Sequence, residues 1–422
     1  MVSFAELRDA KPGLWTDAAN DMRNAARQCE RVRDDIHRNG VQPLGEHWAD
    51  DVGALAKGVL TSVAERAEAV GILARSTVDP VDTLGHAVAV AQNELENGIH
   101  LAEGVGLNVD AQTGLVSPPP GMSRDELAAK LATMQQAQQL INDAVEAATQ
   151  ADALCTAALG ETSANASITN VDQAKKVQSD NTQRALDEFR DTIPDGLSPE
   201  EAGRWWSQLT LQEQSDLIRA CPTEIYQLKG IPDSVKTRID RPELGYSSVG
   251  AVKYALENWN NTDLDEFNDN CTNFVSDSLS YGGGMKQNED WWLPRHYDSD
   301  GWSDGTRGHP GILPPGLSHT PTWAAAQNNR DFFLKNGGRV VDPGQAEPGD
   351  IVYYTMTQDS AGMHAGETHH AAVVTGVLPD GQVLYTQHSD SAKNLPLYGR
   401  LPEFEQSYGQ QKIEIVRPKA TW

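Results

Sequence analysis

Apolar residues in the first half of the chain recur three and four positions apart, which places them on one side of an α-helix. The first such run follows Thr16-Asp17, which can cap a helix, and ends at Asn39-Gly40 and Pro43. A second run with the same period begins at Trp48. We therefore predict a helical hairpin whose helices meet along an apolar seam. The seam residues are Ala18, Met22, Ala25, Cys29, Val32 and Ile36 in the first helix and Val52, Leu55, Val59, Val63, Ala67 and Val70 in the second.

Further helical runs follow at roughly 80–104, 123–158 and 165–191. Residues 108–116, followed by three prolines, predict a small hairpin or loop between two of these helices. Ser198-Pro199-Glu200-Glu201 is a strong helix-start signal. We assign 1–192 to an extended all-α domain and 193–235 to a helical connector.

The pattern changes after residue 236, where glycine, proline, aromatic residues and β-branched runs become more frequent. A helix is predicted at 249–259, and Thr320-Pro321 predicts another that Gly337-Gly338 closes. Apolar strands follow Pro348-Gly349-Asp350 and His370, and a third pairs back across a turn. The predicted second domain, 236–422, is therefore α+β with an antiparallel sheet.

Composition narrows the classes of function. A formal net charge of −26 argues against a nucleic-acid partner, since phosphate binding requires a basic face. The four cysteines are scattered and contain no CxxC pair, which excludes a disulfide framework and a thiolate zinc cage. We expect no secretory signal at the N-terminus and no membrane span.

Cys271 is the candidate nucleophile. Asx residues at 268–270 suit a helix N-cap, and Phe274, Val275, Ser278 and Leu279 recur at helical spacing until three glycines end the run. A thiol in the first turn of a helix is favoured as thiolate, the nucleophilic form. The alternative is a buried cysteine that serves only packing.

Two histidines are the candidate partners of this thiol. His370 stands at the entrance of an apolar strand, where it can act as the thiol's base. A three-residue loop, Pro379-Asp380-Gly381, places Ala372 opposite His388, so that His370 and His388 share one face of the sheet. A two-residue turn would place the two histidines on opposite faces. If His388 points away from His370, Asp390 is the next candidate for the residue that orients His370.

Several motifs in the second domain resemble the family known as "Putative amidase domain". They are Asn-Cys-Thr-Asn-Phe-Val-Ser at 270–276, Thr-Pro-Thr-Trp at 320–323, Pro-Gly-Asp-Ile-Val-Tyr-Tyr at 348–354, His-Ala-Ala-Val-Val-Thr-Gly at 370–376 and Gln-His-Ser at 387–389. The resemblance covers roughly 245–418. It implies a papain-like fold near the NlpC-type cell-wall peptidases, with catalytic residues in the order cysteine, histidine and a polar residue.

On this basis we expect a cysteine amidase or peptidase. Cys271 would attack an amide carbonyl, His370 would take the thiol proton and return it to the leaving amine, and His388 would orient His370. The backbone N–H of Cys271, with the side chain of Asn268 or Asn270, would form the oxyanion hole. The expected substrate is peptidoglycan or another peptide.

The N-terminal hairpin resembles the WXG-type proteins exported by type VII secretion systems, which pair two helices with a tryptophan near the turn. Here the turn reads Trp48-Ala49-Asp50, without the glycine, and a plain helical hairpin is the alternative. The resemblance implies a secreted or cell-surface protein, and a cytoplasmic location is the other expectation. Secretion-system, immunity or chaperone proteins are the expected partners of the helical region.

No cofactor is expected. His364, His369, His370 and Glu367 are close enough in sequence to suggest zinc, but a thiolate mechanism explains more of the pattern. The competing class of function is a non-enzymatic interaction or delivery protein, whose Cys271 would lack unusual reactivity. A toxin acting on a rival's proteins would share the chemistry and differ in substrate.

Overall fold

The computed structural model describes residues 2–48, 50–194, 196–267, 269–288, 300–304, 319–357, 359, 362–397 and 411–422. The chain divides into two compact units, Met1–Ile193 and Pro194–Trp422. The segment 193–235, predicted as a separate connector, thus falls almost entirely within the second unit.

The first unit is helical and carries one small hairpin. Its strands β1 (Asn108–Val109) and β2 (Val116–Ser117) pair antiparallel, as expected for the segment between two helices. None of the described helices is both long and apolar enough to cross a membrane. The helices are α1 (Phe4–Asp9), α2 (Gly13–Ile36), α3 (Gln42–His47), α4 (Asp51–Ser76), α5 (Val78–Gly104), α6 (Arg124–Ala164) and α7 (Val171–Asp191).

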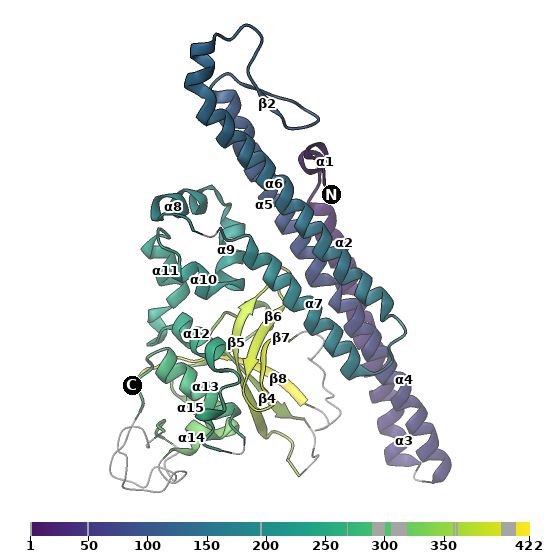
Figure 1. Ribbon diagram of the computed structural model, residues 1–422. Coiled ribbons are helices and arrows are strands. Elements are labelled where there is room, and N and C mark those ends of the chain that lie inside the picture. The colour runs from purple at the N-terminus through teal and green to yellow at the C-terminus, as the bar shows by residue number, and fades with distance from the viewer. Residues whose placement is uncertain are drawn as a thin grey trace. The chain divides into compact units, whose positions relative to one another are not determined.

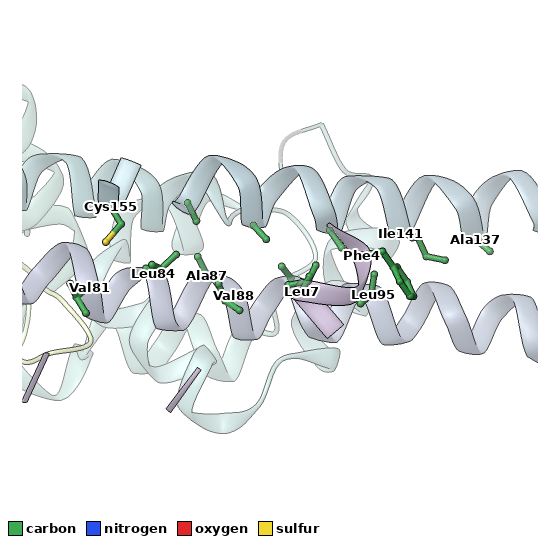
Figure 2. Packing of buried hydrophobic residues seen from close by; sticks show 14 of the residues in the cluster. Phe4, Leu7, Val81, Leu84, Ala87, Val88, Leu95, Ala137, Ile141 and Cys155 are labelled. Atoms are coloured by element: carbon green, nitrogen blue, oxygen red, sulfur yellow. The ribbon is translucent and has the colours of Figure 1, made fainter. Parts of the chain in front are cut away.

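The main core of this unit lies between α5 and α6, with Phe4 and Leu7 of α1 added to it (Figure 2). Small residues let the two helices approach closely, since a Cβ on Gly98 would lie 3.1 Å from the carbonyl oxygen of Ala137. Alanines recur along the buried side of α6: Ala137, Ala144, Ala148, Ala151 and Ala158. The close packing of many small side chains therefore holds this pair together.

Helices α2 and α4 form the predicted hairpin with the predicted seam residue Cys29 at their contact, but the predicted turn and most of the α4 half of the seam are wrong. The helical backbone continues through His37–Val41 as a π-helical segment and into α3, and the chain bends only after His47. Helix α4 packs on α2 through small residues, with the Cβ of Cys29 within 3.0 Å of a Cβ built on Gly71. The predicted seam residues Val52, Leu55, Val59, Val63 and Val70 are instead exposed.

The second unit begins with helices α8–α11, of which α9 packs against the C-terminal sheet. A Cβ on Gly376 would lie 3.0 Å from the carbonyl oxygen of Ala220, and Arg219 donates to the carbonyl of Ala346 at 3.2 Å. Buried Asp350 accepts from Arg241 and Arg417. The helices are α8 (Pro199–Gln208), whose Ser198–Glu201 capping box confirms the predicted start, α9 (Leu211–Ala220), α10 (Pro222–Gln227) and α11 (Asp233–Asp240).

The described strands of this unit form one antiparallel sheet in the order β3-β8-β4-β5-β6-β7 (Figure 1). Their bounds are β3 (Arg339–Val341), β4 (Ile351–Met356), β5 (Thr368–Val377), β6 (Val383–Gln387), β7 (Ala392–Pro396) and β8 (Gln411–Arg417). An α-helical region followed by an antiparallel sheet domain is therefore the architecture of this chain, as predicted.

Helices cover one face of this sheet: α12 (Ser248–Asn258), α13 (Cys271–Asp277), α14 (Pro321–Ala324) and α15 (Ala326–Lys335). The last two replace the single helix predicted from Thr320 to Gly337, because the backbone is extended at Ala325. Phe274, Val275 and Leu279 of the α13 segment pack against Tyr353 and Val373 of the sheet. This packing places the start of α13 beside β5.

Candidate active site

Cys271 is the first residue of α13, as predicted, and Asn270 is its N-cap. The loop before it is held by the Asn270 side chain, whose Oδ1 accepts from the backbone N–H groups of Glu266 and Phe267 at 3.3 and 3.2 Å. Its Nδ2 donates back to the carbonyl of Phe267 at 3.0 Å. Asn270 therefore shapes the loop that delivers the cysteine, and its amide is turned toward that loop.

The Cys271 thiol lies in a nearly closed environment, with 6% of the residue exposed. Burial has the largest single effect and raises the pKa of the thiol, but the hydrogen bond and charge of His370, with smaller effects of Thr272 and Ala371, together lower the pKa below the usual cysteine value. The hydroxyl of Thr272, 3.6 Å from Sγ, and the backbone N–H of Ala371 act in the same direction. The surroundings thus favour a thiolate.

His370 lies on β5 between the thiol and Gln387. Its Nε2 is 2.9 Å from Oε1 of Gln387, the last residue of β6. The Gln387 Nε2 donates to the carbonyl oxygen of Asp390 at 3.0 Å, which turns the amide oxygen toward the imidazole. Nε2 of His370 is then the protonated nitrogen of the neutral ring, and Nδ1 is the basic one.

The ring of His370 is also packed against an aromatic side chain. Its cross-strand partner Tyr354 meets it edge to face, with ring centroids 5.4 Å apart. The Tyr354 hydroxyl donates to that of Tyr385 at 3.0 Å. Rotation of the imidazole is therefore restricted on one side by Tyr354 and at Nε2 by Gln387.

His388 does not reach His370. The predicted loop is present: the N–H of Leu378 donates to the carbonyl of Gln382 at 2.9 Å, and Gly381 has φ 87°. The register that it sets holds for Val377↔Val383 and Gly376↔Leu384.

A bulge at Thr375 then shifts the pairing by one residue, because Val374 pairs with Tyr385. Continued from there, the shifted register brings Gln387 rather than His388 to the position opposite Ala372. Gln387 therefore shares the face of His370, and His388 is turned away. The signal for the bulge was Gly376, a glycine inside an otherwise apolar strand.

The His388 imidazole is buried and hydrogen-bonded elsewhere. Its Nδ1 lies 2.8 Å from the carbonyl oxygen of Trp259, and its Nε2 lies 2.5 Å from Oδ1 of Asp265. The ring stacks on Phe274 of α13 with centroids 5.4 Å apart. Asp390, the next candidate, contacts the site through its backbone carbonyl, which binds Gln387.

Asn268, the other side chain expected at the oxyanion hole, lies outside the described residues. Trp302 is fully buried and tilted against Trp323 with ring centroids 4.6 Å apart, so it anchors the core beside α13.

The described residues contain no cluster of three or more His, Cys, Asp or Glu side chains that could hold a metal ion. The three histidines considered for zinc have separate neighbours. Nδ1 of His364 lies 3.7 Å from Oδ2 of Asp359, and Nε2 of His369 lies 2.6 Å from Oε1 of Gln411. His370 contacts Gln387, as described above.

Comparison with known proteins locates the domain that carries these residues. Residues 245–410 match the family model described as "Putative amidase domain", which indicates amide hydrolysis. The uncharacterized protein YhbB of Bacillus subtilis (strain 168) is 26% identical over 196 residues, which cover 42% of this chain and 56% of YhbB. The chain thus spans little more than half the length of that relative. No solved structure matches this chain significantly.

Proposed function

We propose that the amidase-like domain is a cysteine-dependent hydrolase of an amide or peptide bond, with Cys271 as nucleophile, His370 as base and Gln387 as the residue that orients His370. The observation that carries the proposal is the chain of contacts from thiol to imidazole to amide, in which His370 lies between Cys271 and Gln387. A thiol used only for packing would not need an oriented histidine.

The reaction follows from these contacts. His370 takes the thiol proton at Nδ1, and the thiolate attacks the carbonyl carbon to form a tetrahedral oxyanion. The imidazolium gives its proton to the leaving amine as the C–N bond breaks, which leaves a thioester. His370 then takes a proton from water, the hydroxide attacks the thioester, and the carboxylic acid and the thiol are released.

The backbone N–H of Cys271 is the proposed oxyanion donor, because the first N–H of a helix has no acceptor within the helix. Asn270 is a poor second donor, because its amide is turned toward the preceding loop. The order of a cysteine at a helix start, a histidine on an antiparallel strand and an amide side chain supports a papain-like, NlpC-type arrangement.

Peptidoglycan or another peptide is the proposed substrate. The helical unit is the proposed export or delivery module. It would use a type VII-like route and bind secretion-system, immunity or chaperone proteins. Trp48, which is 46% exposed between α3 and α4, supports the second part of this proposal.

Incubation with purified peptidoglycan, followed by mass analysis of the released fragments, tests the hydrolase. The Cys271→Ala variant serves as the blank, and the same preparation is tried on denatured protein to detect a toxin-like peptidase. Release by the wild type alone is expected. Equal release by Cys271→Ala would exclude Cys271 as the nucleophile.

A further inference from the structure

The turn that follows β6 has an unusual backbone. Ser389 and Asp390 are consecutive residues with positive φ, 44° and 53°. Residues other than glycine rarely adopt this conformation, because Cβ crowds the backbone there. The surrounding structure must therefore hold the turn in place, and its contacts indicate what it does.

Ser389 holds the residue that precedes the nucleophile. Its Oγ accepts a hydrogen bond from the backbone N–H of Asn270 at 2.8 Å, across 119 positions of sequence. The carbonyl of Asn270 in turn accepts from Phe274 N at 2.9 Å, which closes the first turn of α13. The Ser389 hydroxyl thus fixes the peptide from which Cys271 extends.

Asp390 holds the other half of the site. Its backbone carbonyl accepts from Nε2 of Gln387, and this bond directs the Gln387 oxygen toward His370. The side chain of Asp390 is exposed and has no described part in these contacts. Adjacent residues of one turn therefore contact the backbone of Asn270, which precedes the nucleophile, and the side chain of Gln387, the partner of His370.

His388 anchors the turn to the loop that leads toward Cys271. Both ring nitrogens face acceptors on that loop, the carbonyl of Trp259 and the carboxylate of Asp265, and the ring stacks on Phe274. The histidine considered as a catalytic residue thus binds the turn to the nucleophile side of the site.

We propose that residues 388–390 form a positioning clasp, in which Ser389 is the positioning residue that sets the thiol of Cys271 against the imidazole of His370. The inference rests on the proposed function, because it concerns how the same thiol and imidazole are brought together.

The test is the rate at which iodoacetamide modifies Cys271 between pH 5 and 9, measured by mass spectrometry of the Cys271 peptide in the full chain. This readout requires no known substrate. Ser389→Gly removes the acceptor and suits the positive φ, so relief of backbone strain offsets part of the lost hydrogen bond and the variant is expected to fold. Ser391→Gly makes the same substitution at an exposed residue of the same turn, outside the clasp, so it is the matched control.

Ser389→Gly is expected to react about fivefold more slowly near pH 6, the factor that corresponds to one net hydrogen bond, and its pH profile should shift toward that of an ordinary thiol. Ser391→Gly should follow the wild-type profile. If wild-type Cys271 reacts fast and Ser389→Gly has the same pH profile, the clasp is refuted while the hydrolase proposal stands. If wild-type Cys271 reacts no faster than Cys29 near pH 6, the hydrolase proposal fails and the clasp fails with it.

Discussion

Glu188 in α7 is a buried carboxyl group whose ionisation should control the stability of the helical unit. It is 5% exposed, and the described residues offer its Oε1 no hydrogen-bond partner. Burial, with the charge of Asp191, raises its pKa from 4.5 to about 8. Cys155 of α6 lies in the same environment, where burial and the charge of Glu188 raise the pKa of its thiol to about 12.

The sign of the effect follows from the raised pKa. Below pH 4.5 the carboxyl is protonated in both states, so its burial costs no ionisation energy. As the pH rises, the unfolded chain ionises first while the folded chain keeps its proton, and stability is lost until the pH passes about 8. Since each pKa unit corresponds to about 1.4 kcal/mol, the loss at pH 7 is about 3 kcal/mol.

Glu188→Gln removes this ionisation but adds a buried amide donor, which costs about 1 kcal/mol. We therefore expect the free energy of unfolding of the variant to exceed that of the wild type by about 2 kcal/mol at pH 7. Urea denaturation of a fragment spanning 1–193, followed by circular dichroism at several pH values, measures the difference. Glu146→Gln, a change of an exposed glutamate on α6, is the control. Parallel pH curves for Glu188→Gln and the wild type would refute the reasoning.

Three further expectations concern the second unit. Gln387→Ala should lower kcat for the peptide released in the peptidoglycan assay about tenfold or more with little change in KM, because the imidazole of His370 loses its orienting acceptor. An unchanged kcat would contradict an orienting role for Gln387. Arg241→Ala should lower the free energy of unfolding in urea by about 3 kcal/mol, because it removes one ion-pair partner of buried Asp350. The control Lys253→Ala, which breaks an exposed ion pair, should lower it by under about 1 kcal/mol, and equal losses would refute this prediction. A fragment spanning 194–422 should be soluble, whereas one spanning 236–422 should aggregate, because the shorter fragment lacks the helix that packs beside Gly376. A shorter fragment that folds would count against this prediction.

Helical periodicity predicted the helices of the first unit well and their contacts poorly. Helix α4 has two faces that could pack: one carries valines and Leu55, and the other carries Gly53, Ala64 and Gly71. The larger apolar side chains indicated the wrong one. Helix α2 approaches the small-residue face, where it also buries Arg33 within 3.9 Å of Glu68. Periodicity identifies an apolar face, but it does not say which element covers it.

In the second unit, local signals sufficed for α13, β5 and β6, the elements that carry the candidate site. Asx residues predicted the start of α13, and Pro-Asp-Gly predicted the loop between β5 and β6 correctly. The error at His388 arose from one residue, because an assumption of regular pairing was carried past Gly376. Sequence alone does not locate a bulge within a few residues, and every side chain beyond it changes face.

The different partners of Gln387 and His388 explain why the amide is suited to orient the base. The two residues are adjacent, so their side chains take opposite directions, and the bulge decides which one meets His370. Both ring nitrogens of His388 are directed at Trp259 and Asp265, so neither is directed at the Nε2–H of His370. The amide of Gln387 gives its N–H to Asp390 and keeps its oxygen for the histidine. The same one-residue shift therefore places an acceptor beside the base and leaves an imidazole to bind the loop that carries the nucleophile.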